Sequence, residues 1–259
     1  KSYNIKYALI HDYLCIFAQY ENNNPFVLMP IGEGNILPVI EELITYFKSI
    51  GAKLIIRSLT KGMIEQIERE VPSKFEYKPE RSTFDYVYLN SDLINLEGKK
   101  YHSKRNHINK FISTYDYTYY PLTKDLVDEC IKAAEEWCEK KNCEESAGLE
   151  QEKLAIIDAL NHFEQLGFKG GVIKIDGKVI AFTYGEQYTD DMAVIHVEKA
   201  DSDIHGSYTV INQKFCENEW REVEYINREE DLGIAGLRKA KKSYYPVRMI
   251  EKYSATLIE

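Results

Sequence analysis

The chain has 259 residues, of which 44% are hydrophobic and 12% aromatic, enough for one large domain or two of about 130 residues. Its formal net charge of -9 argues against a protein that coats nucleic acid without sequence preference, and we predict no DNA partner. No run approaches 18 apolar residues, so we predict no transmembrane segment. The first four residues do not resemble a signal peptide.

The five cysteines are an odd number and include no CxxC pair; they are Cys15, Cys130, Cys138, Cys143 and Cys216. This pattern is typical of reduced thiols in a cytoplasmic protein, which is the location that we predict. The amino-acid composition does not fix the oligomeric state, and we expect a monomer or a weak dimer.

The first half opens with apolar, alternating segments at 7–20 and 26–31 around a polar stretch, a pattern that predicts a hairpin. Residues 37–50 have helical apolar spacing, with Pro38 in the first turn and Gly51 after the end. The later elements are expected to be a strand at 53–57, a helix at 61–71, a strand at 84–89 and an interrupted helical stretch at 93–112.

The second half has clearer signals. Asp176-Gly177 separates two apolar strand patterns, and Asp-Gly suits a type I′ hairpin turn. In chain order, we expect a strand at 115–122, helices at 124–141 and 148–166, strands at 171–175, 178–188 and 192–197, a helix at 208–220, a strand at 223–227, a helix at 231–245 and a strand at 247–257.

The resulting order, β-α-α-β-β-β-α-β-α-β, is the order of the GNAT acyltransferase fold. The first half contains a partial copy of it, namely hairpin, helix, strand, helix and strand. We therefore predict an α/β chain with a tandem GNAT fold, in which two mixed sheets are flanked by helices. Residues 1–122 are the expected N-terminal half, and residues 123–259 the C-terminal half with the main site.

Four segments narrow this resemblance: KRNHINKF at 104–111, DGKVIAF at 176–182, HVEKAD at 196–201 and INREEDLGIAGLRKAKKSYYP at 226–246. They resemble the soluble relatives of the C-terminal domain of phosphatidylglycerol lysyltransferase. The resemblance implies a tandem GNAT fold and, for the membrane members, transfer of an aminoacyl group from tRNA to a lipid. It implies no particular reaction for the soluble members, and without transmembrane helices a lipid acceptor is not expected.

Two of the predicted strands end in polar residues, where α/β folds form ligand sites. Strict alternation along 192–199 places His196 and Glu198 on one face. In a GNAT fold this strand diverges from the next one, so Glu198 can act as a general base or bind a substrate amine. The alternatives are a Glu198 satisfied by Lys199, Arg228 or backbone donors, and a His196 that is an ordinary hydrogen-bonded residue.

The last strand-to-helix segment provides further candidates. We predict that Asn227, Glu229 and Asp231 line the site and that Arg238 and Lys239 hold an anionic part of the donor. The alternative is that acidic residues in the first turn of the last helix and basic residues in its last turn complement the helix dipole.

The last helix ends in Tyr244 and Tyr245. Many GNAT enzymes have a tyrosine general acid in the corresponding helix, and we take Tyr244 as the candidate, although the sequence does not separate the two tyrosines.

Gly206, Ser207 and Tyr208 begin the helix expected at 208–220, and its N-terminus is the predicted donor-binding position. Coenzyme A users have a glycine-rich loop here. This chain keeps a single glycine and has Asp201 and Asp203, whose charges would repel phosphate. We expect no firmly bound cofactor and leave both acyl-CoA and aminoacyl-tRNA open as donors.

A basic stretch with interleaved aromatic residues includes Lys104, Arg105 and Asn106. It suits an RNA backbone or a phosphate-bearing ligand, and a solvated helix face is the alternative. His102 and His107 are five residues apart and do not share a helix face, so we predict no metal site.

These observations predict an enzyme, an acyl- or aminoacyltransferase that acts on an amine or a hydroxyl. The rival is a non-catalytic GNAT-like module that binds an amino acid, a peptide or a nucleotide. The reduced glycine loop favours the rival, as would a Glu198 held in ion pairs.

Overall fold

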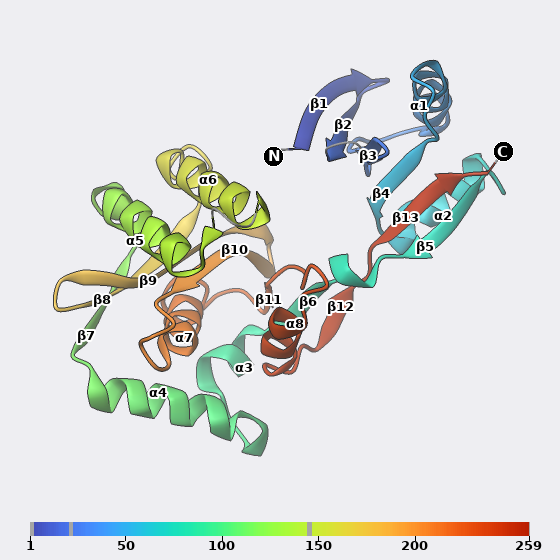
Figure 1. Ribbon diagram of the computed structural model, residues 1–259. Coiled ribbons are helices and arrows are strands. Elements are labelled where there is room, and N and C mark those ends of the chain that lie inside the picture. The colour runs from blue at the N-terminus through green and yellow to red at the C-terminus, as the bar shows by residue number, and fades with distance from the viewer. Residues whose placement is uncertain (1–2, 21–22, 144–146, 259) are drawn as a thin grey trace. The chain divides into compact units, whose positions relative to one another are not determined.

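The computed structural model describes residues 3–20, 23–143 and 147–258. The chain forms two compact units, each with its own mixed sheet and flanking helices (Figure 1). The first unit contains residues 1–85, 230–235 and 250–259, and the second contains residues 86–229 and 236–249. Among the described residues no helix is long and apolar enough to cross a membrane.

The first unit has a six-stranded sheet in the order β1-β2-β3-β4-β13-β5. Its strands are β1 (Tyr3–Ile10), β2 (Tyr13–Tyr20), β3 (Phe26–Leu28), β4 (Ile55–Leu59), β5 (Phe75–Pro79) and β13 (Tyr253–Leu257). Strands β3 and β4 are parallel, and the other paired strands are antiparallel. The core packs the sheet against α1 (Leu37–Ser49) and α2 (Lys61–Glu70). Helix α1 forms as predicted, with Val39, Ile40, Leu43 and Phe47 buried along one side.

The segment expected as one apolar stretch at 7–20 is two strands. His11 and Asp12 both have positive φ, 47° and 67°, so the chain reverses in a two-residue turn between β1 and β2. The sequence signal was weak because the turn contains no glycine, the residue that most readily adopts positive φ. Strand β5 was also absent from the prediction.

The second unit has a seven-stranded sheet in the order β12-β6-β11-β10-β9-β8-β7. Its strands are β6 (Asp85–Leu89), β7 (Tyr117–Pro121), β8 (Lys169–Ile175), β9 (Lys178–Thr189), β10 (Met192–Ala200), β11 (Tyr225–Asn227) and β12 (Arg248–Ile250). Strands β10 and β11 are parallel and are joined through α7 (Ser207–Glu219). The first sheet has the same arrangement, in which β3 and β4 are parallel and α1 lies between them in the chain.

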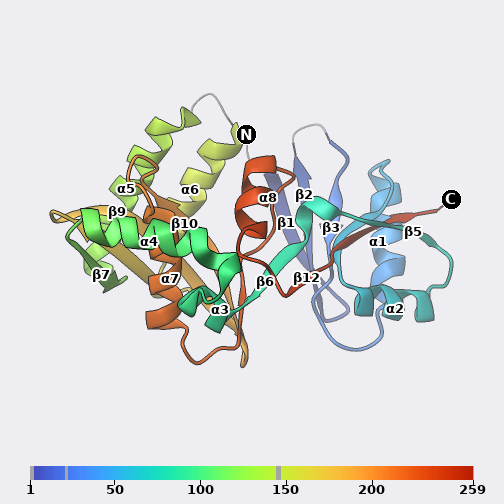
Figure 2. The same cartoon turned by 90° about the horizontal axis from the view of Figure 1, so that it is seen from below.

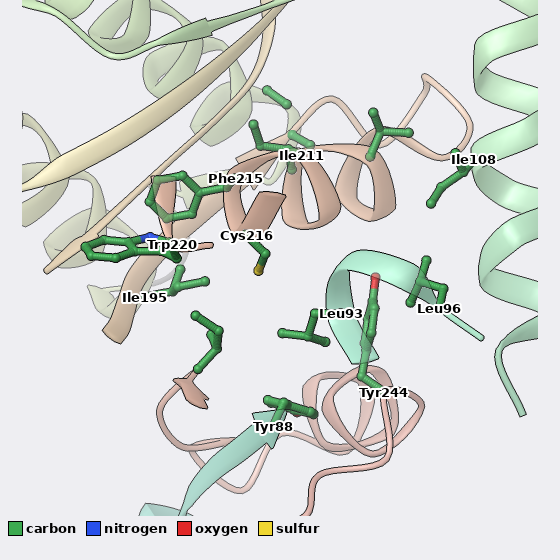
Figure 3. Close-up of a cluster of buried hydrophobic side chains, with 14 of the residues drawn as sticks. Tyr88, Leu93, Leu96, Ile108, Ile195, Ile211, Phe215, Cys216, Trp220 and Tyr244 are labelled. Carbon is green, nitrogen blue, oxygen red and sulfur yellow. The ribbon is translucent and has the colours of Figure 1, made fainter. Parts of the chain in front are cut away.

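Helices cover both faces of the second sheet (Figures 1 and 2). One core lies under α5 (Val127–Lys140) and α6 (Ala147–Asn161). The other core includes buried residues of α7, α3 (Asn90–Asn95) and α4 (His102–Thr114). Figure 3 shows part of it in close-up, with Ile211, Phe215 and Trp220. Helix α8 (Ala235–Lys242) follows β11 and begins four residues later than predicted, because Leu232 and Gly233 have positive φ.

Strand pairing explains why the compact units differ from the expected halves. Strand β6 pairs with β11, so residues 86–122 belong to the second unit. Strand β13 pairs with β4 and β5, so the C-terminal residues belong to the first unit. The single strand expected at 247–257 is therefore β12 and β13, which lie in different sheets.

Two of the five cysteines are not free thiols. Helix α5 ends at Lys140, and Asn142 with φ 50° turns the chain back, so that the Cα atoms of Cys138 and Cys143 lie 5.2 Å apart and the pair forms a disulfide. The expectation of five reduced thiols is wrong for this pair. Cys15, Cys130 and Cys216 are free and buried.

Candidate active site

The two parallel strands of the second sheet separate at their carboxyl ends. They pair from Met192–Tyr225 to Val194–Asn227, after which β11 stops while β10 continues to Ala200. The chain leaving β11 turns at Glu229, whose φ is 54°, and the Asn227 Oδ1 atom accepts the Glu229 N–H at 2.7 Å. Asn227 thus stabilises the turn that aims the next two side chains at β10.

The first of these side chains forms a buried ion pair with β10. Arg228 Nη2 lies 3.0 and 3.1 Å from the two carboxylate oxygens of Glu198, and each side chain is 13% exposed. Asn212 of α7 donates from Nδ2 to the same carboxylate at 3.1 Å. Arg228 Nη1 and Asn212 Oδ1 are buried and have no hydrogen-bond partner among the described residues. A buried ion pair with unsatisfied atoms beside it is costly unless a ligand or water completes it.

Lys104 and Tyr244 lie beside this ion pair, and we call the group of Glu198, Arg228, Lys104 and Tyr244 the centre. Lys104 Nζ of α4 lies 3.7 Å from the centroid of the Tyr244 ring, and Arg228 Cζ lies 4.9 Å from the same centroid. Burial, and then the charge of Arg228, lower the pKa of Lys104 to about 8. Burial raises the pKa of Tyr244 to about 12. The amine thus lies over the face of the Tyr244 ring, and the two side chains offer an amine with a lowered pKa and a phenol that keeps its proton.

The structure also separates the two tyrosine candidates. Tyr244 is buried in the cluster drawn in Figure 3, whereas Tyr245 is 46% exposed. Tyr244 is therefore the tyrosine that lies beside Glu198, Arg228 and Lys104.

His196 lies in a separate group of polar residues. Its Nδ1 is 2.8 Å from Glu229 and its Nε2 is 3.1 Å from Glu186 of β9. The bond to Glu229 raises the pKa of His196 against the opposing effect of burial, and Glu186 adds to the rise. In the protonated form both ring nitrogens can donate, so the two carboxylates favour that form.

The expectation that His196 and Glu198 share a face is wrong. The β9–β10 register shifts between Ile195 and Val197, so His196 is the extra residue of a β-bulge. His196 consequently packs 5.2 Å from Phe168 on the α5–α6 side, whereas Glu198 bonds to α7 on the other side. Strict alternation failed here because an inserted residue reverses the alternation beyond it.

The predicted donor-binding residues at the start of α7 have structural partners. Gly206 has φ 88°, and a Cβ there would lie 2.6 Å from the carbonyl oxygen of His107 in α4. Ser207 Oγ donates to the Asp201 carbonyl at 2.8 Å, and the Tyr208 hydroxyl accepts from Trp137 at 3.2 Å.

Charged groups surround the same helix start. Lys140 binds Asp201 at 2.7 Å and Asp203 at 2.8 Å, so the loop before α7 already pairs its two carboxylates with a lysine of the chain. The helix start is thus packed against α4 and flanked by acidic residues, surroundings that do not favour a phosphate.

The side chains of the basic stretch do not all lie in the same place. Lys104 reaches the centre, whereas Arg105 Nη1 donates to the Leu96 and Gly98 carbonyls at the end of α3. Asn106 lies on the exposed side of α4, 3.2 Å from His102. The solvated-face alternative therefore describes part of this segment.

The remaining candidates do not join the centre. Asp231 is fully buried in the first unit, where it binds Arg81 at 3.3 Å and accepts the Gly233 N–H at 2.9 Å. On α8, Arg238 is half-buried and Lys239 is exposed.

Sequence reasoning gave Arg228 only as a structural partner of Glu198 and missed Asn212 and Glu186. For Arg228 and Asn212 the sequence contains a feature that could have identified them. Arg228 directly follows a strand end, and Asn212 interrupts an apolar helical run.

A mixed sheet whose parallel strand pair opens around a buried polar centre defines a GNAT-like fold. A tandem GNAT protein from the clavulanic acid biosynthesis pathway shares this fold, with 8% sequence identity and a TM-score of 0.50 over 94% of this chain and 78% of that chain. The family model for the C-terminal domain of phosphatidylglycerol lysyltransferase matches residues 1–256, and the chain belongs to this family. The family resemblance found in the sequence is thereby confirmed.

Two further solved structures are similar to this chain. A conserved protein of unknown function from Bacteroides thetaiotaomicron is 41% identical, with a TM-score of 0.90 over 99% of this chain and 86% of that chain. L-PGS from Bacillus licheniformis is 17% identical and shares the fold, with a TM-score of 0.67 over 98% of this chain and 84% of that chain.

Proposed function

We propose that this chain is a transferase that moves an aminoacyl group from the ester of an aminoacyl-tRNA to an amine or hydroxyl acceptor. The observation that carries the proposal is the group of Glu198, Arg228, Tyr244 and Lys104 at the strand divergence, where a base, an acid and a cation lie together. The family, named for a lysyltransferase, supports an aminoacyl unit as the group transferred.

The start of α7 supports an RNA ester over a coenzyme A thioester as the donor. Coenzyme A needs free backbone N–H groups for its pyrophosphate at a helix N-terminus. Here Gly206 lies against the His107 carbonyl, and Asp201 and Asp203 flank the loop. An ester carried by tRNA does not need this subsite, because its phosphates lie along the RNA.

The chemistry assigns one task to each group. The acceptor attacks the ester carbonyl carbon, and its proton passes to the neutral amine of Lys104, whose pKa of about 8 suits a base. Arg228 Nη1, buried without a protein partner, donates to the developing oxyanion. The ester C–O bond then breaks, and the Tyr244 hydroxyl gives its proton to the leaving ribose oxygen. Lys104 then releases its proton to water and the Tyr244 phenolate takes one from water, which restores both groups.

In this proposal Glu198 positions Arg228 and does not act as the base, because its two oxygens are bonded to Arg228 and Asn212. Glu229 and His196 line the edge of the strand divergence on the α5–α6 side. Lys239 and Arg238 remain candidates for the phosphates of the donor.

Transfer to a small nucleophile tests the proposal without knowledge of the natural acceptor. Bulk tRNA charged with labelled amino acids is incubated with the chain and dilute hydroxylamine, and aminoacyl hydroxamate is measured over the uncatalysed rate. We expect acceleration that is lost in Lys104→Met and kept in Lys110→Met, an exposed position on the same helix. No acceleration with any charged tRNA would contradict the proposal.

The second candidate is a non-catalytic module that binds an amino acid, a peptide or a nucleotide. The observation that favours it is the Glu198–Arg228 pair, which leaves the carboxylate without a free oxygen for proton transfer. A thermal-shift panel separates the two candidates. Stabilisation by free amino acids, peptides or nucleotides without any transfer supports the module, and stabilisation by charged but not uncharged tRNA supports the transferase.

A further inference from the structure

One face of the β1–β2 hairpin in the first unit is apolar and is largely exposed along β1, whereas along β2 Leu14 and Ile16 are half-buried and Ala18 is buried. Cross-strand pairing places Ile5 beside Ala18, Tyr7 beside Ile16, and Leu9 beside Leu14, and Leu14 pairs in turn with Ile31. We call this surface the outer hairpin face; its large side chains are Ile5, Tyr7, Leu9, Leu14, Ile16 and Ile31. Four of them are largely exposed: Ile5 at 63%, Tyr7 at 80%, Leu9 at 77% and Ile31 at 57%.

The opposite face of the same hairpin shows what a covered face looks like. Ile10, Tyr13 and Cys15 are buried in the core with α1, and the Phe17 ring lies 5.2 Å from Tyr46. None of the six residues of the outer hairpin face belongs to a buried core cluster of the described residues. Strands that are apolar on both faces are typical of sheets covered on both sides, and a contiguous exposed patch marks a contact surface.

Strand β1 is also a free edge. It is the first strand of the sheet, and β2 is its neighbour, so its outer row of N–H and C=O groups pairs with no described strand. The other edge, β5, carries Glu76, Lys78 and Pro79, which discourage pairing with another strand. Strand β1 has eight residues without proline or a bulge in its pairing to β2, and Lys6 is its one charged residue.

We propose that β1 pairs antiparallel with β1 of a second copy of this chain. A two-fold axis at Tyr7 places Ile5 of one copy opposite Leu9 of the other, and Tyr7 opposite Tyr7. The same register places Lys6 opposite Ala8, so the two lysines do not face each other. The two outer hairpin faces then join into one apolar surface across the new strand pair, and both edges are satisfied.

The contact is small. A stable interface buries roughly 800 Å² on each partner, and weak ones bury less. Two strand edges with three exposed apolar side chains each belong to the small class. The dimer is therefore expected to be weak and to dissociate on dilution.

Sedimentation velocity from about 1 to 200 μM tests the proposal, together with amide exchange of β1. We expect the mass to approach twice that of the monomer at high concentration and the β1 amides to exchange more slowly there. Tyr7→Lys places two charges on the axis and should abolish the dimer, whereas Tyr188→Lys, at a tyrosine 68% exposed in β9, should leave it unchanged. Both positions are exposed, so both variants should keep the wild-type melting temperature.

The register has its own test. Leu9→Lys alone should dissociate the dimer, and the double variant Ile5→Glu with Leu9→Lys should restore it, because each new carboxylate faces an ammonium of the other copy. Within one copy the two positions are about 13 Å apart along the strand and do not pair. A wild-type chain that stays monomeric at 200 μM, or a dimer that tolerates Tyr7→Lys, would overturn the proposal.

Discussion

The guanidinium group of Arg228 lies 3.0 Å from the carboxylate of Glu198, and this pair joins the end of β11 to β10 beyond the point where the two strands cease to pair. Both side chains are 13% exposed, so each charge depends on the other. The Glu198 carboxylate therefore holds Arg228 in position and contributes to the stability of this part of the second unit.

Removal of one partner should be costly. Glu198→Gln leaves Arg228 charged and buried beside Lys104, and we expect the free energy of unfolding to fall by about 3 kcal/mol in urea denaturation. The matched control is Glu217→Gln, which breaks a half-exposed pair with Lys214 and should cost less than about 1 kcal/mol. Equal losses in the two variants would show that the Glu198 pair is not effectively buried.

The reaction should depend on the protonation of Lys104. A base works when neutral, so the transfer rate should rise with pH and level off above an apparent pKa of about 8. Lys104→Arg keeps the charge but cannot supply a neutral amine, and we expect both the rate and this pH-dependent limb to be lost. A limb that survives in Lys104→Arg would assign the base to another group.

Lys104 should also affect stability in a predictable direction. Its folded pKa, about 8, lies below the unfolded value of 10.5, so the unfolded chain binds more protons between these values and the contribution of Lys104 to stability improves as pH rises through this window. The melting temperature of Lys104→Met relative to the wild type should therefore be higher at pH 7 than at pH 10. An unchanged difference would indicate an unshifted lysine.

His196 should titrate above the ordinary histidine value. The Glu229 bond is the largest cause of its raised pKa, so NMR titration of the ring should give an apparent pKa above 6.5. Glu229→Gln should lower that pKa more than Glu186→Gln does. The stabilisation from this group is complete below 6.5 and is lost as pH rises through the folded pKa. A larger effect of Glu186→Gln would reverse the assignment.

Gly206 should tolerate no side chain. Gly206→Ala adds a Cβ 2.6 Å from the His107 carbonyl at a φ of 88°, and we expect a loss of about 2 to 4 kcal/mol in the free energy of unfolding. Gly62→Ala is the control, because nothing lies within 4 Å of its Cβ, and helix propensity should raise stability by up to about 1 kcal/mol. Similar effects at both glycines would argue that α4 does not pack on the start of α7.

The amino-acid sequence determined the local elements and the family. Helix α1 is predicted by the spacing of its own apolar residues, by Pro38 in its first turn and by Gly51 after its end. The turn at Asp176-Gly177 is predicted by those two residues alone. Such features depend on short-range sterics and apolar periodicity, which a sequence displays directly.

The tertiary structure decided which polar groups meet. The bulge at His196 arises from the pairing of β10 with β9, and it moves His196 to the face opposite Glu198. Lys104 and Tyr244 are 140 positions apart in sequence and meet because α4 and the segment after α8 pack in the same cluster. Strand β6 pairs with β11, and β13 pairs with β4 and β5, so each strand pairs with strands that lie far from it along the chain. Long-range strand pairing and burial set these contacts, and they leave no periodic signal in the segment where each residue lies.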